Sequence, residues 1–415
     1  MSFQRVEEEG DEYLDGDLPW YWEEKTTKEG FIFYVNHKQR STHWMHPRAE
    51  SKRVYEELPY GWSEEPKTDS SPITFVDHIS MKKSYCDPRL IRNAESENES
   101  QRSKKRKKLG AGLTAMDVLE GKILTNQYVI ITGGNSGIGF ETARALAMHG
   151  AHVVIACRDM VAARTAIENI CQQKCDACVE AMHVDLGSLT NVKAFTDEYK
   201  RRQWPLHLLI CNAAVFGIPY TLSDDGLEMN FAVNYLGHFY LTWLLQEELV
   251  ASRPSRVVVV SSESHRFYSL SWNQELDLDL VPTPRSSYWS ILAYGQSKLC
   301  CLLFAIELNR RLAKHGVKSY AVHPGNMVYT GLGRHSWFYR MLFFLARPFT
   351  KSIEQSASTA LYCATLTEPD EMGGGYFIDC TKHEPSDEAK QPELARRLWE
   401  LSKQIICQKT NLYNS

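Results

Sequence analysis

The sequence predicts an α/β domain built on an open parallel sheet, preceded by two small all-β modules. Short apolar runs rich in β-branched residues alternate with helix-like stretches from residue 120 onward, an order typical of βαβ units. An aromatic-rich unit occurs twice before residue 90. The chain has 415 residues, 43% of them apolar, which allows one large core beside the two modules. The predicted parts are two all-β modules (17–50 and 57–90), a flexible basic linker (91–119) and the α/β domain (120–415).

A glycine-rich turn follows the first predicted strand of the large domain. The apolar run 128–131 leads into this turn, and a helix-like stretch from Phe140 to His149 follows it. A strand, a glycine-rich turn and a helix in this order direct backbone N–H groups at a phosphate. A tight turn without a ligand is the alternative for the motif alone. The predicted pyrophosphate-binding residues are Gly133, Gly134, Asn135, Ser136, Gly137, Ile138 and Gly139.

The end of the second strand bears on the type of dinucleotide. A carboxylate there would bind the ribose 2′-hydroxyl of NAD, whereas a nearby cation accommodates the 2′-phosphate of NADP. The strand 152–156 is followed by Cys157 and Arg158, which favours NADP(H). Asp159 comes next and keeps NAD(H) open as the less favoured cofactor. A solvated surface arginine is the other interpretation of Arg158.

Polar residues also follow the later strands. Asp185 follows Val184, Asn212 follows the run 208–211, and Ser261 and Ser262 follow the run 257–260. Ligands of open parallel sheets bind at the carboxyl ends of the strands, so we expect these residues to line one crevice.

Tyr294 and Lys298 stand four residues apart in a helix-like stretch. On a helix this spacing places both side chains on one face. An ordinary tyrosine titrates near pH ~10 and is a poor acid-base group near neutrality. An ammonium group beside a phenol favours the phenolate. The pair therefore predicts proton transfer coupled to hydride transfer at a carbonyl or alcohol.

Over residues 120 to 380 this ordered set resembles the short-chain dehydrogenase/reductase family. The resemblance implies a doubly wound (Rossmann) sheet of about seven parallel strands. It also implies that Tyr294 is the general acid/base and that Lys298 promotes its ionisation and holds the nicotinamide ribose. Ser262, chosen over Ser261 from its place in the motif, would bind and polarise the substrate oxygen. Asn234 would hold a water beside Lys298. The other cofactor-binding residues expected are Arg158, Asp185, Asn212, Pro324, Gly325 and Thr330.

The repeated N-terminal unit has a Leu-Pro-x-x-Trp start, an aromatic run and a closing proline. It begins at Leu18 and again at Leu58. Each copy is shorter than the ~40 residues at which a domain without metal or disulfide usually folds alone. In the first copy Trp22, Tyr34 and Pro47 would pack together.

Both copies resemble WW domains, which bind proline-rich peptides in the polyproline II conformation. In the first module the resemblance implies that Phe33 and Trp44 form the groove for a proline ring. Val35, His37 and Arg40 would form the pocket for the tyrosine of a Pro-Pro-x-Tyr ligand.

The second module departs from the pattern. Tyr85 replaces the groove tryptophan and Thr74 the groove aromatic residue. We expect this module to bind little peptide by itself and to support the fold of the first.

Composition limits the classes of partner and site. The net charge of −4 gives no reason to expect nucleic acid as a specific partner. The spacing of Cys171, Cys175 and Cys178 lacks a fourth ligand, so no metal site is expected, and reduced cysteines fit an intracellular protein. No run reaches the ~18 apolar residues needed to span a bilayer. The apolar stretch 337–349 would cover the substrate pocket or, alternatively, touch an organelle membrane peripherally. Members of the family often form dimers or tetramers, but no residue here fixes the oligomeric state.

The linker contains five consecutive basic residues, Lys104 to Lys108. Such a run is a nuclear import signal, a patch for phosphate or lipid headgroups, or a solvated tether. We expect a cytoplasmic protein that moves to the nucleus through this segment.

Two functions fit the whole chain. The first is an NADP(H)-dependent reductase of a lipophilic, steroid- or retinoid-like carbonyl or alcohol, joined to modules that bind Pro-Pro-x-Tyr proteins. The alternative is a signalling adaptor in growth control and apoptosis, whose reductase domain serves mainly as a cofactor or redox sensor.

Overall fold

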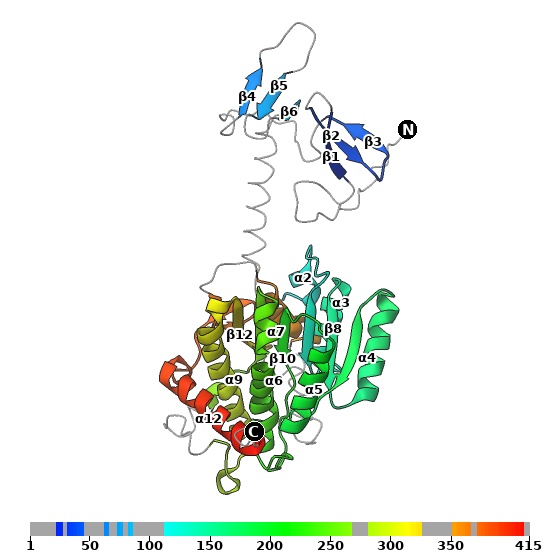
Figure 1. Ribbon diagram of the computed structural model, residues 1–415. Coiled ribbons are helices and arrows are strands. Elements are labelled where there is room, and N and C mark those ends of the chain that lie inside the picture. Colours follow the sequence, from blue (N-terminus) through cyan, green and yellow to red (C-terminus); the bar gives the residue numbers. More distant parts are fainter. Residues whose placement is uncertain are drawn as a thin grey trace, which may run out of the picture. The chain divides into compact units, whose positions relative to one another are not determined.

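In the computed structural model the chain forms two compact units, Met1–Lys108 and Leu109–Ser415 (Figure 1). The residues described are 22–27, 31–44, 62–65, 73–77, 82–85, 112–267, 281–325, 351–366 and 372–410. Thr330, the basic run 104–108 and the stretch 337–349 lie outside these ranges.

The first unit contains two three-stranded antiparallel sheets, as the repeat predicted. In the first sheet the burial alternates along the middle strand, with Ile32, Tyr34 and Asn36 buried and Phe33 and Val35 on the other face. The side chain of Asn36 accepts a hydrogen bond from the Gln39 backbone N–H across 2.9 Å and so stabilises the turn that follows. The strands are β1 (Trp22–Thr26), β2 (Ile32–Asn36) and β3 (Ser41–His43) in the first sheet, and β4 (Trp62–Glu65), β5 (Thr74–Asp77) and β6 (Lys82–Ser84) in the second.

The second unit is built on an eight-stranded sheet of order β14-β13-β12-β11-β10-β7-β8-β9. Seven strands are parallel, which confirms the expected doubly wound sheet, and the last pairs antiparallel with its neighbour. The central strands are buried on both faces, as continuous runs of valine and isoleucine require. The strands are β7 (Tyr128–Thr132), β8 (His152–Cys157), β9 (Val179–His183), β10 (Leu208–Cys211), β11 (Ser255–Val260), β12 (Val317–His323), β13 (Tyr376–Ile378) and β14 (Thr381–His383).

Helices cover both faces of this sheet (Figure 1). One core lies beneath α2 (Ala115–Leu119), α3 (Gly137–Met148), α4 (Met160–Gln173) and α11 (Ile353–Ala364). The other lies beneath α5 (Leu189–Arg201), the π-helix η1 (Phe231–Leu236), α6 (Gly237–Leu244), α7 (Gln246–Ala251), α9 (Ser290–Leu312) and α12 (Pro392–Thr410). Short 3₁₀ turns follow at η3 (Arg285–Ser287), η4 (Ala313–His315) and η8 (Glu388–Lys390).

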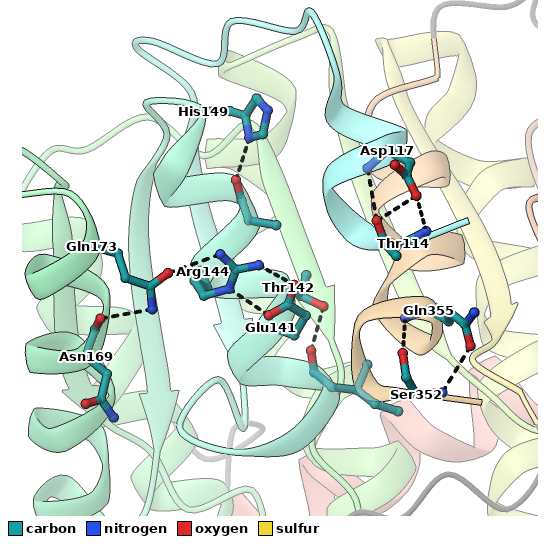
Figure 2. A network of polar contacts seen from close by, with 12 residues as sticks. Thr114, Asp117, Glu141, Thr142, Arg144, His149, Asn169, Gln173, Ser352 and Gln355 are labelled. Carbon is teal, nitrogen blue, oxygen red and sulfur yellow. Dashed lines mark hydrogen bonds and ion pairs between the residues drawn. The ribbon is translucent and has the colours of Figure 1, made fainter. Parts of the chain in front are cut away.

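The predicted linker extended to residue 119, and the structure corrects this boundary. Residues 115–119 form α2, with Ala115 and Leu119 fully buried in the core of the α/β unit. Thr114 and Asp117 form a reciprocal cap at its N-terminus, and Ser352 and Gln355 form the same kind of cap on α11 (Figure 2). A five-residue helix is too short to give a periodic signal in the sequence, which is why the prediction missed it.

The C-terminal helix packs on the helices that carry the candidate site. Trp399 of α12 meets Phe239 of α6 edge-on, with ring centroids 4.7 Å apart. The buried Tyr235 hydroxyl lies 2.6 Å from Ser402 Oγ, and Ser402 itself donates to the Leu398 carbonyl. Tyr235 is therefore the donor, and α12 accepts a hydrogen bond from η1.

Within the described part of the chain, the segment Ser290–His315 has the length and apolar composition of a membrane span. However, 78% of its apolar window is buried inside the protein. Because it is buried in this way, we interpret the segment as a central core helix of the α/β unit.

Candidate active site and peptide groove

The glycine-rich turn between β7 and α3 is fixed by an asparagine from a neighbouring strand. Asn212 Nδ2, just after β10, donates to the Thr132 carbonyl across 2.9 Å. Gly133 has a φ of 67°, in the left-handed region that favours glycine. A Cβ at Gly139 would collide with the Gly133 carbonyl oxygen and with Asn212 Nδ2. The turn therefore depends on glycine for its close packing.

The N-terminus of α3 has the features of an anion-binding site. Ser136 is its N-cap, and its side chain makes no capping hydrogen bond. The first N–H groups of a helix have no partner within the helix, and they attract anions. The residues present thus fit a dinucleotide pyrophosphate.

Arg158 and Asp185 lie together at the carboxyl ends of β8 and β9. Arg158 Nη1 is 3.8 Å from Asp185 Oδ2, and the arginine side chain is 54% exposed. Asp159, which had left NAD(H) open, accepts hydrogen bonds from the N–H groups of Val161 and Ala162 at the start of α4. Its carboxylate is therefore occupied as a helix cap.

Tyr294 and Lys298 lie on one face of α9. Lys298 is only 2% exposed, and its Nζ is 5.5 Å from the centroid of the Tyr294 ring. The ammonium donates to the Val260 carbonyl at the end of β11, across 2.8 Å. Phe216 meets the Tyr294 ring edge-on at 4.8 Å. No pattern in the sequence predicts this aromatic neighbour.

The two serines after β11 have different environments. Ser261 is buried and its hydroxyl donates to the Lys298 carbonyl across 2.7 Å. The half-buried Ser262 exchanges hydrogen bonds with Ser264, whose N–H and Oγ are both 3.1 Å from Ser262 Oγ. Ser261 thus joins the sheet to α9, while Ser262 is the more exposed of the two serines.

Asn234 lies in the π-helix η1, an element often found at functional sites. Its Oδ1 accepts from the Val215 N–H, and its Nδ2 donates to the Val215 carbonyl and to Ser297 Oγ. These bonds join the loop after β10 to the helix that carries Tyr294. The predicted water beside Lys298 stays a prediction.

His238, which the sequence analysis did not single out, joins the turn to this helix. The ring is fully buried, with Nε2 2.7 Å from Thr132 Oγ1 and Nδ1 2.9 Å from the Asn234 carbonyl. Burial lowers the pKa of His238 to about 4, so the ring is neutral at physiological pH. A signal was present, because the histidine stands four residues after Asn234 on the same helical face.

Pro324 and Gly325 follow β12 at the same edge of the sheet, and Gly325 has a φ of 120°. Thr330, expected beyond them, is outside the described ranges. No group of three or more histidine, cysteine, aspartate or glutamate side chains suited to a metal ion occurs among the residues that the structure describes.

The first small sheet carries the residues expected to form the peptide groove. The rings of Phe33 and Trp44 are 5.9 Å apart and inclined at 62°, and Trp44 is 48% exposed. Val35 lies on the same face of β2 as Phe33. His37 Nε2 is 2.9 Å from Glu23 Oε2, and the exposed Arg40 has a φ of 53° in the adjoining turn. Phe33 and Val35 thus lie on one face of β2, with the Trp44 ring against Phe33, and peptide binding at this face stays a prediction.

The second module contributes a ring beside this groove. Tyr85 stacks on Phe31 at 4.9 Å and meets the Trp44 ring edge-on at 5.5 Å. The buried Thr74 cannot serve as an exposed groove residue. These contacts agree with a supporting role for the second module.

The comparisons with known proteins match both parts of the chain. A short chain dehydrogenase family model matches residues 127–273, and a WW domain model matches residues 18–47. A WW domain-containing oxidoreductase of Gallus gallus is 48% identical over 392 residues, which cover 94% of this chain and 94% of that protein. Retinol dehydrogenase 12 of Mus musculus is 41% identical over 283 residues, which cover 68% of this chain and 87% of that protein.

One solved structure extends the likeness to the fold. The crystal structure of an uncharacterized protein from Mycobacterium Paratuberculosis superposes with a TM-score of 0.55 and 32% identity, covering 71% of this chain and 97% of that one. The predicted first WW module and the predicted reductase fold are confirmed. With both parts present and near-full coverage of a relative, this chain belongs to the family of WW domain-containing oxidoreductases, whose larger part is a short chain dehydrogenase.

Proposed function

We propose that the α/β unit is an NADP(H)-dependent oxidoreductase of a lipophilic carbonyl or alcohol, and that the first WW module binds Pro-Pro-x-Tyr segments of partner proteins. The observation that carries the enzyme proposal is the placement of Tyr294 and Lys298 on one face of α9, beside the end of β11 that carries Ser262. Tyr294, Lys298 and Ser262 would serve as proton donor, cation and hydrogen-bonding hydroxyl at the sheet edge where ligands of such folds bind.

The residues at this edge fit a nicotinamide dinucleotide. The turn 133–139 would hold the pyrophosphate, and Arg158 would face the 2′-phosphate of NADP(H), since the carboxylate of Asp159 caps α4. When bound, the cofactor supplies or accepts the hydride.

The protein handles the proton. In reduction the Tyr294 hydroxyl gives its proton to the substrate oxygen, and in oxidation the tyrosinate takes it back. The Lys298 ammonium, 5.5 Å from the ring, stabilises the negative charge left on the tyrosine oxygen. The Ser262 hydroxyl donates a hydrogen bond to the same substrate oxygen, where negative charge develops.

The class of substrate rests on two observations. The relative named retinol dehydrogenase 12 covers most of the α/β unit at 41% identity. Phe216 also places an apolar ring against Tyr294. Both favour a retinoid- or steroid-like substrate.

The test compares NADPH with NADH binding to the purified full chain by calorimetry, followed by turnover of all-trans-retinal and of ketosteroids. We expect tighter NADPH binding and activity that Tyr294→Phe removes. Tyr128→Phe, at the opposite end of the sheet, is the matched control. A chain that binds neither dinucleotide, or whose turnover survives Tyr294→Phe, contradicts the proposal.

An adaptor role in growth control and apoptosis is the second candidate, supported by the half-exposed Trp44 beside Phe33. Cells carrying Trp44→Ala or Tyr294→Phe separate the two roles. A phenotype with Trp44→Ala alone favours the adaptor, and one with Tyr294→Phe alone favours the enzyme.

The proposed location is the cytoplasm, with movement to the nucleus through residues 104–108. Neutralising these five basic residues is expected to lower the nuclear fraction of a fluorescent fusion. An unchanged fraction contradicts the import role and leaves the phosphate or lipid-headgroup patch and the solvated tether.

A further inference from the structure

The segment that follows Ser262 forms a tight, hydrogen-bonded turn. The N–H groups of His265, Arg266 and Phe267 donate to the carbonyls three residues earlier, each across 3.1 Å. The Ser264 N–H donates to Ser262 Oγ. The position of the Ser262 hydroxyl therefore depends on how this turn is held.

His265 holds the turn from inside the protein. Its ring is completely buried, and Nδ1 is 2.6 Å from the Ser262 carbonyl oxygen. On the other side of the ring, Nε2 accepts a hydrogen bond from the Ser386 backbone N–H across 3.2 Å. Ser386 lies just beyond β14, so the ring links the candidate serine to the C-terminal part of the sheet.

These two partners define the state of the ring. A carbonyl only accepts, so Nδ1 carries a hydrogen. A backbone N–H only donates, so Nε2 carries none. Burial lowers the pKa of His265, which agrees with a neutral ring. The imidazole therefore acts as a fixed donor and acceptor, not as a proton-transfer group.

A second set of contacts holds the same turn. The Tyr376 hydroxyl of β13 donates to Glu263 Oε1 across 2.8 Å, and Arg266 Nε donates to Glu263 Oε2 across 2.9 Å. Arg266 Nη2 also donates to the Glu384 carbonyl across 2.6 Å. Tyr376 of β13 and the segment after β14 thus hold the turn at Glu263, His265 and Arg266.

We propose that His265 is a positioning residue: through its Nδ1–H bond to the Ser262 carbonyl it holds the serine hydroxyl at the substrate oxygen. This inference rests on the proposed role of Ser262. It adds a buried histidine, through its bond to the Ser262 carbonyl, to the groups that determine the rate.

Two substitutions separate the bonds of the ring. In His265→Asn the amide nitrogen lies near the former Nδ1, so donation to Ser262 is kept and the contact with Ser386 is lost. In His265→Gln the longer side chain reaches Ser386 and its carbonyl oxygen accepts the N–H, while the bond to Ser262 is lost. Each variant loses one hydrogen bond of the buried ring, so the pair is matched.

The kinetic readout is kcat and KM for retinal reduction with NADPH by the full chain. We expect His265→Asn to keep kcat within about threefold, and His265→Gln to lower it roughly 10- to 100-fold with little change in KM, as misplacement of a reacting group does. The pH profile of kcat should keep its shape in His265→Asn. Equal losses in both variants, a greater loss in His265→Asn, or a changed pH profile overturns the proposal.

A structural readout tests the role of His265 even if the wild type has no turnover. Absence of turnover would contradict the proposed function but not the placement of the turn by His265. Nitrogen NMR of the His265 ring should show the hydrogen on Nδ1. Hydrogen exchange of the Ser264 amide, which reports on Ser262 Oγ, should be faster in His265→Gln than in His265→Asn. A ring protonated on Nε2, or equal exchange in the two variants, contradicts the assignment.

Discussion

The Thr132 hydroxyl donates a hydrogen bond to Nε2 of His238 across 2.7 Å. The direction follows from the ring, because a neutral imidazole that carries its hydrogen on Nδ1 can only accept at Nε2. The other ring nitrogen, Nδ1, must donate to the Asn234 carbonyl. The residue before the glycine-rich turn is thus joined to the π-helix of the candidate site by one neutral imidazole.

This buried imidazole makes the stability of the α/β unit dependent on pH. The unfolded histidine takes up a proton below pH ~6.5, whereas burial keeps the folded pKa at about 4. Between these values the unfolded state binds more protons, so the free energy of unfolding falls as the pH falls. For His238 alone the loss amounts to roughly 3 kcal/mol.

Urea denaturation at pH 7 and pH 4.5 measures this dependence. We expect His238→Asn to be less stable at pH 7 but to lose less stability on acidification than the wild type. The free energy of unfolding of this variant should still fall as the pH falls, though less steeply. The reason is that burial also lowers the pKa values of His207 and His265. Identical slopes in wild type and variant would remove His238 as a cause.

Gly139→Ala tests the packing of the cofactor turn. The added methyl group would displace the Gly133 carbonyl and the Asn212 side chain, so we expect a loss of ~1–3 kcal/mol in stability and a loss of NADPH binding. The matched control is Gly112→Ala, since a Cβ there meets nothing within 4 Å. Calorimetric titration with NADPH measures both variants, and unimpaired binding to Gly139→Ala would contradict the geometry.

Arg158→Ala tests the preference for NADP(H). If the guanidinium faces the 2′-phosphate, the dissociation constant for NADPH rises roughly 10- to 100-fold, as expected for a charge-assisted bond of ~1.5–3 kcal/mol. NADH binding should change little. Arg164→Ala, on α4, is the control. Equal losses for both cofactors would assign Arg158 a structural role, through its contact with Asp185.

Tyr85→Ala tests the support given by the second WW module. An edge-on aromatic pair contributes about 0.5–1.5 kcal/mol, so losing its contact with Trp44 should weaken binding of a Pro-Pro-x-Tyr peptide about two- to tenfold. Trp44→Ala should abolish binding, and Trp289→Ala, an exposed tryptophan of the other unit, should leave it unchanged. Fluorescence anisotropy of a labelled peptide measures all three. Full affinity in Tyr85→Ala would leave the second module without this role.

The sequence was sufficient for the parts of the site that local patterns define. The spacing of Tyr294 and Lys298 placed them on one helical face, and the glycines of the turn indicated the close approach that the structure shows at Gly139. The two small sheets followed from the repeated aromatic pattern.

Contacts between distant segments were not predictable in this way. Phe216 reaches Tyr294 only because Asn234 fixes Val215, and Ser386 reaches His265 only because β14 turns back along the sheet. The helix α2 was missed because five residues are too few for a periodic signal. The role of Asp159 as a cap depended on its side-chain direction.

The bond between Tyr235 and Ser402 spans 167 residues of the chain. At synthesis rates of ~5–20 residues per second, the partner of this phenol is made roughly ten to thirty seconds after it. The buried hydroxyl of Tyr235, the residue after Asn234, therefore does not have this acceptor until the segment around residue 402 has been made. A chain truncated before residue 402 would lose the acceptor and leave this phenol in the core without the hydrogen bond.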